Sequence, residues 1–123
     1  MTELPKKHIA IFGSTGSIGK QALDVIKAHP TLFEVEILTA YSNDELLITQ
    51  ALEFLPNAVV ITDESKYEKV KQALSAHPIK VFAGEKGLEE VADFDTYDVM
   101  LAAIVGFAGL KPTLKAVEKG KII

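Results

Sequence analysis

The chain contains no cysteine among its 123 residues, which excludes a disulfide framework and a thiolate metal site. It also lacks an apolar run near the roughly 18 residues that a membrane-spanning helix needs, and "MTELPKKH" at residues 1–8 has no apolar signal-peptide core. The net charge of −4 shows no excess of positive charge and argues against nucleic acid as a partner. We therefore expect a cytoplasmic globular protein that binds neither membrane nor nucleic acid.

Apolar segments rich in branched residues alternate with segments of helical period. The alternation predicts one α/β domain with a doubly wound (Rossmann-like) parallel sheet and helices on both faces. The expected strands are residues 7–13, 33–40, 57–62, 79–84 and 97–105. The residues expected on the inner helix faces are Ile18, Ala22, Val25 and Ile26, then Leu47, Ala51, Phe54 and Leu55, then Tyr67, Val70 and Leu74, then Leu88, Val91 and Ala92.

The last segment, "GLKPTLKAVEKGKII", predicts a helix with Pro112 in its first turn and Leu114 and Val117 facing inward. Gly120 suits the position just past a helix. The residues after Gly120 look like the beginning of a sixth strand, so we expect residues 1–123 to be an incomplete domain.

Three glycines, Gly13, Gly16 and Gly19, form a G-x-x-G-x-x-G turn between the first expected strand and the first expected helix. Such a turn lets the backbone approach a pyrophosphate, which the N–H groups and the dipole of the helix N-terminus favour. The simpler alternative is a close connection between strand and helix without a ligand. Hydroxyl donors are expected from Ser14, Thr15 and Ser17.

The residues after the second strand, Tyr41, Ser42 and Asn43, include no acid. An Asp or Glu at this place would accept from the ribose of NAD and repel the 2′-phosphate of NADP. The sequence therefore favours NADP, with hydrogen bonds from Ser42 and Asn43, although no lysine or arginine stands nearby in the sequence to supply charge. An alternative for Ser42 is a capping box with Glu45 at the start of the second helix.

Small residues in "AAIVGFAG", residues 102–109, follow the fifth strand. They predict either close approach of the backbone to a ring at the sheet edge or tight packing between sheet and helix. The residues alone do not choose between the two.

The stretches "GSTGSIGKQALDVI" and "AAIVGFAGLKPTLKAVEKGK" together resemble the N-terminal domain of the 1-deoxy-D-xylulose 5-phosphate reductoisomerase family. The resemblance implies that the pyrophosphate of NADPH is held by Thr15, Gly16, Ser17 and Ile18, and that Asn43 lies near the adenosine phosphate. It implies a nicotinamide side formed by Ala103, Ile104 and Gly106. At Tyr41 and Ser42 the chain departs from a family pattern of glycine followed by lysine.

The resemblance also implies an activity. Members of this family rearrange 1-deoxy-D-xylulose 5-phosphate with the help of a divalent metal, Mn²⁺ or Mg²⁺, and reduce the resulting aldehyde with NADPH to 2-C-methyl-D-erythritol 4-phosphate. The metal ligands, the catalytic residues and the sugar-phosphate site would lie outside residues 1–123, in a homodimeric parent enzyme. Two other interpretations stay open at this point: a semialdehyde or acyl-phosphate reductase, which shares the first motif, and a regulatory nucleotide-sensing domain.

Overall fold

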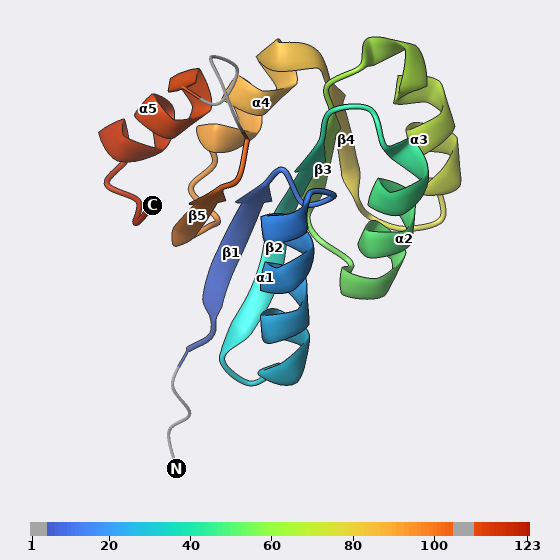
Figure 1. Ribbon diagram of the computed structural model, residues 1–123. Helices are drawn as coiled ribbons and strands as arrows, with labels where there is room; N and C mark the ends of the chain where they lie inside the picture. Colours follow the sequence, from blue (N-terminus) through green and yellow to red (C-terminus); the bar gives the residue numbers. More distant parts are fainter. Residues whose placement is uncertain (1–4, 105–109) are drawn as a thin grey trace.

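A five-stranded parallel sheet forms the centre of the molecule (Figure 1). The computed structural model describes residues 5–104 and 110–123. The strands lie in the order β4-β3-β2-β1-β5, so the chain runs outward from β1 to β4 and then returns to the other side of β1. The strands are β1 (Lys7–Phe12), β2 (Phe33–Ala40), β3 (Ala58–Ile61), β4 (Lys80–Ala83) and β5 (Val99–Ala102).

Helices cover both faces of this sheet, because each parallel connection must cross over it. On one face lie α1 (Ser17–Ala28), α2 (Asp44–Phe54) and α3 (Tyr67–Ala73), and on the other lie α4 (Gly84–Ala92) and α5 (Leu110–Glu118). A 3-10 turn, η1 (Glu64–Lys66), precedes α3. The predicted doubly wound α/β architecture is confirmed.

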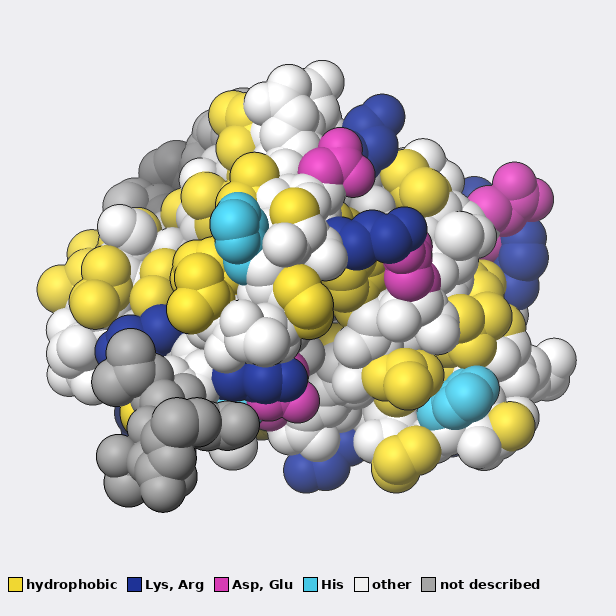
Figure 2. Space-filling view, turned by 90° about the horizontal axis from the view of Figure 1, so that it is seen from below, with side chains coloured by type: hydrophobic (Ala, Val, Ile, Leu, Met, Phe, Trp, Pro, Cys, Tyr) yellow, Lys and Arg dark blue, Asp and Glu magenta, His cyan; other side chains and the backbone are white. Residues whose placement is uncertain are grey.

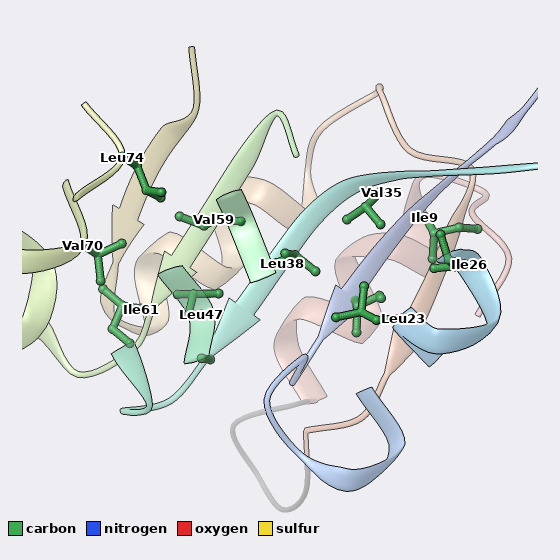
Figure 3. Packing of buried hydrophobic residues seen from close by; sticks show 13 residues of the cluster. Ile9, Leu23, Ile26, Val35, Leu38, Leu47, Val59, Ile61, Val70 and Leu74 are labelled. Carbon is green, nitrogen blue, oxygen red and sulfur yellow. The ribbon is translucent and has the colours of Figure 1, made fainter. Parts of the chain in front are cut away.

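Each face of the sheet has its own hydrophobic cluster. Figure 3 shows the first, in which Leu23 of α1, Leu47 of α2 and Val70 of α3 pack on Leu38 and Ile61 of the sheet. The second joins α4 and α5 to the opposite face through Phe12, Ile37, Val60, Leu88, Val91 and Ala116. Burying each large apolar side chain contributes about 1.5–3 kcal/mol, so both layers of helices are held to the sheet.

The inner face of α1 differs from the prediction. Ile26 is buried as predicted, but Ile18 and Val25 are 61% and 54% exposed. The buried positions on the described helix are Gly19, Leu23 and Ile26. Gly19 allows α1 to pack closely on the turn, so this residue takes an inner position, and Ile18 and Val25 face outward.

The C-terminal helix shows the same kind of difference. Leu114 and Val117, which were predicted to face inward, are exposed, whereas Pro112 and Ala116 are buried.

Gly120 follows the helix with a φ of 75°, as its position predicts. Beyond it, Ile122 forms a parallel bridge with Val99, where the beginning of a sixth strand was predicted.

The end of the molecule at the amino ends of the strands carries a mixed surface. Figure 2 shows this face, where lysine and acidic side chains lie interspersed among hydrophobic ones. Within residues 5–104 and 110–123, no helix has both the length and the apolar character needed to span a membrane.

Candidate functional site

The carboxyl ends of the central strands coincide at one edge of the sheet. Phe12, the last residue of β1, pairs with Thr39 of β2 on one side and with Ala102 of β5 on the other. Because the chain leaves β1 toward β2 and returns later as β5, this edge is the topological switch point at which open α/β sheets bind ligands. The glycine turn, the Tyr41 corner and the segment after β5 all begin here.

Two of the three glycines are required by the protein itself. Gly13 has a φ of 95°, and a Cβ on it would lie 2.8 Å from the carbonyl oxygen of Ala103. A Cβ on Gly19 would lie 2.6 Å from the Cα of Ser14. Gly13 thus lets the turn approach the end of β5, and Gly19 lets α1 pack on the turn.

Gly16 is different, because nothing in the fold requires a glycine there. Its φ of −80° and ψ of 176° suit any residue, and a Cβ would meet no atom closer than 3.8 Å. Gly16 is also the N-cap of α1, where no side chain caps the helix and the first turn holds no acid. The N-terminal N–H groups and the positive end of the helix dipole are therefore available to an anion.

A cavity of about 380 Å³ opens beside this turn. It brings together three segments singled out in the sequence: the glycine turn, the corner after β2 and the segment after β5. Its lining residues are Gly13, Thr15, Gly16, Thr39, Ala40, Tyr41, Thr62, Glu85, Leu88, Ala103 and Ile104. A volume in the range of 300–1,000 Å³ is usual for a site that binds a small molecule or cofactor.

Four of the other predicted site residues are not among those that line this cavity. Ser17 and Ile18 begin α1 with exposed side chains, and Ser42 and Asn43 are exposed after β2. Gly106 lies within residues 105–109, outside the described residues. The contacts of all these residues with a cofactor stay predictions.

Ser14 faces the interior, unlike the hydroxyl donor that the sequence predicts. Its side chain is fully buried, and its Oγ lies 2.7 Å from Oε1 of Gln50 and 3.2 Å from the carbonyl oxygen of Thr39. The Thr39 carbonyl accepts from the N–H of Ser14 at 2.8 Å, and the Thr39 hydroxyl accepts from the N–H of Gly13 at 2.9 Å. Ser14 therefore anchors the turn to β2 and α2.

The residue that caps α2, after β2, differs from the one predicted. The side chain of Asn43, not of Ser42, caps α2, because its Oδ1 accepts from the N–H of Leu46 at 3.2 Å. This bond leaves the amide NH₂ of Asn43 free to donate to a ligand. The capping box between Ser42 and Glu45 is therefore not formed.

Two lysines that are distant from this corner in the sequence lie near it in the structure, where they pair with an acidic side chain. Nζ of Lys69 lies 3.0 Å and Nζ of Lys66 lies 3.6 Å from the carboxylate of Asp44, the residue after Asn43. The hydrogen bond from Lys69 and the charges of both lysines hold the pKa of the buried Asp44 carboxyl below its ordinary value. The carboxylate is thus matched by two positive charges.

Sequence reasoning missed Thr39, Gln50, Lys66 and Lys69. Thr39 lies inside an apolar strand and Gln50 inside a helix, where a single polar side chain has no motif to mark it. The two lysines lie more than 20 residues beyond Asn43, and only the pairing of β3 with β2 brings them near it. Across the parts of the chain that the structure describes, no three carboxylate or histidine side chains are placed to hold a metal ion.

Comparison with known proteins agrees with this geometry. The family model described as 1-deoxy-D-xylulose 5-phosphate reductoisomerase matches residues 9–123. The enzyme of that name from Bacteroides fragilis is 54% identical over 123 residues, which are 100% of this chain and 32% of the relative. The one from Phocaeicola vulgatus is 52% identical over 118 residues, 96% of this chain and 31% of the relative.

Solved structures show the same similarity in three dimensions. The reductoisomerase from Zymomonas mobilis in complex with NADPH superposes with a TM-score of 0.90 at 38% identity, covering 95% of this chain and 31% of that one. A reductoisomerase in complex with NADPH, fosmidomycin and magnesium superposes with a TM-score of 0.89 at 35% identity, covering 94% and 28%. This chain spans about a third of the length of the curated relatives it matches. Because the family model covers residues 9–123, the chain belongs to the 1-deoxy-D-xylulose 5-phosphate reductoisomerase family.

Proposed function

We propose that this chain binds NADPH as the cofactor-binding domain of a 1-deoxy-D-xylulose 5-phosphate reductoisomerase. Gly16 is the observation that carries the proposal. The fold has no need of a glycine at this position, yet a side chain there would fill the space next to an uncapped helix N-terminus and an adjoining cavity. That space fits a pyrophosphate approached closely by backbone.

The chain's own residues would divide the cofactor among three segments. The turn at Thr15, Gly16, Ser17 and Ile18 would hold the pyrophosphate with N–H groups and hydroxyls. The corner at Tyr41, Ser42 and Asn43 would hold the adenosine ribose and its 2′-phosphate, and the segment after β5 would lie along the nicotinamide side. When bound, NADPH supplies the hydride that reduces an aldehyde.

The activity of the whole enzyme extends this proposal. The parent enzyme would rearrange 1-deoxy-D-xylulose 5-phosphate and reduce the product to 2-C-methyl-D-erythritol 4-phosphate, with Mn²⁺ or Mg²⁺ as the metal. We place its metal ligands, sugar-phosphate site and catalytic residues outside this chain, and we expect a cytoplasmic homodimer. Two solved relatives, one with magnesium and one with fosmidomycin and magnesium, support the metal requirement.

Calorimetric titration of the 123-residue chain with NADPH tests the proposal. We expect saturable binding at one site, and competition between NADPH and NADP⁺ for it. Absence of binding at millimolar cofactor, by a chain whose circular dichroism shows it to be folded, would contradict the proposal.

A further inference from the structure

The side chain of Gln50 has no place in the motifs of the sequence, yet it contacts the glycine turn directly. Gln50 lies on α2 and is only 6% exposed. Its Nε2 donates to the carbonyl oxygen of Ser14 at 2.9 Å, and its Oε1 accepts from the hydroxyl of Ser14 at 2.7 Å. A carbonyl oxygen accepts only, so this pair of bonds defines which end of the amide faces which atom.

These bonds control the orientation of one peptide group. The carbonyl of Ser14 belongs to the same planar unit as the N–H of Thr15, and the described chain contains no cis peptide bond. In a trans peptide the C=O and the N–H point in opposite directions. By drawing the Ser14 carbonyl toward α2, Gln50 directs the N–H of Thr15 away from α2, and Thr15 lines the cavity.

The amino side of Ser14 is held independently by β2. The N–H of Ser14 donates to the carbonyl of Thr39 at 2.8 Å, and the N–H of Gly13 donates to the Thr39 hydroxyl at 2.9 Å. Without Gln50, the peptide that follows Ser14 would lose its restraint and leave a buried carbonyl without a donor. That carbonyl would then gain by turning toward solvent, which places a partial negative charge beside the cavity.

We propose that Gln50 is a positioning residue that holds the Ser14–Thr15 peptide so that the N–H of Thr15 faces the pyrophosphate of the bound dinucleotide. The inference rests on the proposed function, because it assigns a role toward the same cofactor. It adds Gln50 to the residues that determine the conformation of the phosphate-binding turn, although this residue lies on a different helix, 34 positions after Gly16 in the sequence.

Two substitutions test the role. Gln50→Met keeps a similar volume and removes both hydrogen bonds, and we expect its affinity for NADP⁺ to fall about tenfold to a hundredfold, the range for loss of a hydrogen bond to a charged group. The matched control is Gln72→Met on the surface of α3, where the glutamine is exposed. The control should leave the dissociation constant unchanged.

Gln50→Glu separates positioning from simple stability. An ionised carboxylate cannot donate to the Ser14 carbonyl, whereas a protonated carboxyl donates with one oxygen and accepts with the other, as the amide of Gln50 does. Burial raises the pKa of a carboxyl group, so protonation is accessible under mildly acidic conditions. We expect the variant to bind NADP⁺ weakly at pH 8 and to recover toward the wild-type dissociation constant as the pH falls toward 5, with both proteins measured at each pH.

The outcomes separate this inference from the proposed function. If the wild-type chain binds no NADP⁺, the proposed function fails. If the wild type binds but Gln50→Met binds equally well, or if the ratio of dissociation constants for Gln50→Glu and wild type does not change with pH, Gln50 does not position the turn. The pH series decides the matter even where Gln50→Met is poorly folded.

Discussion

At the scale of single residues, the three glycines of one motif are not equivalent, because the packing of the protein requires only two of them. Gly13 needs a positive φ and close approach to Ala103, and Gly19 needs close approach to Ser14. Only Gly16 is left unexplained by the protein's own packing. The sequence pattern marks all three alike, so their separation required the positions of the atoms that a Cβ would meet.

Replacing Gly16 with valine is expected to abolish cofactor binding while the fold persists. The added side chain would occupy the space proposed for the pyrophosphate, whereas the backbone at this position suits any residue. An apolar residue at an N-cap costs about 1 kcal/mol relative to a good cap, so we expect a small loss of stability. Calorimetry with NADPH and urea unfolding measure the two effects. A folded variant that binds NADPH as well as the wild type would show that the turn is purely structural.

Cofactor choice is expected to depend on the corner after β2. Ser42 and the free amide of Asn43 offer donors to a 2′-phosphate, and each hydrogen bond to a charged group contributes about 1.5–3 kcal/mol. One surviving contact of about 1.4 kcal/mol is already a tenfold preference. We therefore expect the chain to bind NADPH at least about tenfold more tightly than NADH.

The same corner offers a variant that reverses this preference. Ser42→Asp places a carboxylate where the 2′-phosphate is expected. Because like charges repel, NADPH should bind more weakly, and the dissociation constant of NADH divided by that of NADPH should fall. Ser75→Asp, on an exposed serine distant in the sequence, is the control and should leave the ratio unchanged. An unchanged ratio in Ser42→Asp would mean that residues 41–43 do not face the ribose.

At the scale of helices and strands, the alternation of apolar and helical segments predicted the sheet and its helices. Several residues predicted to face inward are nevertheless exposed: two in α1, two in α5, and Leu55 directly after α2, which is 56% exposed. In α1 the buried stripe passes through Gly19, which no measure of hydrophobicity marks as an inner residue, and Ile18 and Val25 consequently face outward. In α5, Pro112 and Ala116 take the inner positions. Small residues that permit close packing therefore decided which face is buried.

Local sequence patterns also did not predict the contacts between elements that are distant in the sequence. Asp44 begins α2, whereas its partners Lys66 and Lys69 belong to η1 and α3. Their approach depends on β3 lying beside β2. Gln50 and Ser14 are joined in the same way, through α2 packing against the turn that follows β1.

The ion pairs of Asp44 are expected to stabilise the protein in a pH-dependent way. The folded-state pKa of Asp44 lies below its ordinary value of 3.8, chiefly because Lys69 hydrogen-bonds to the carboxylate. A lowered pKa contributes stability that is present above the unfolded-state pKa and is lost as the pH falls through the folded-state pKa. Lys69→Met should therefore unfold at a lower temperature than the wild type at pH 7, and the difference should shrink below about pH 4.

Lys86→Met provides the control for this measurement, because Lys86 is an exposed lysine on α4. It should change the unfolding temperature little at either pH. An equal difference between Lys69→Met and wild type at pH 7 and pH 3 would show that the lysine acts through packing of its aliphatic stem and not through its charge.

At the scale of the whole molecule, the fold explains how the proposed cofactor site forms from three segments whose individual sequence signals are weak. The turn after β1, the corner after β2 and the segment after β5 meet because β1 lies between β2 and β5. The observed strand order thus determines the place of the site, while the cap at Asn43, the lysines near Asp44 and the bonds of Gln50 depend on side-chain geometry that local sequence patterns do not specify.

Cofactor binding by the 123-residue chain is expected to stabilise it without any turnover. A ligand that binds only the folded state at a hundred times its dissociation constant adds about 2.7 kcal/mol to the free energy of unfolding. Saturating NADPH should therefore raise the unfolding temperature by several degrees. The same chain with 1-deoxy-D-xylulose 5-phosphate, Mn²⁺ and NADPH should leave the near-ultraviolet absorbance of NADPH constant, because a cofactor site alone neither orients the sugar phosphate nor holds a metal ion. Stabilisation with constant absorbance is the result expected of a cofactor-binding domain. Substrate-dependent loss of NADPH would place catalytic residues within this chain, and absence of stabilisation by NADPH would contradict the proposed cofactor site.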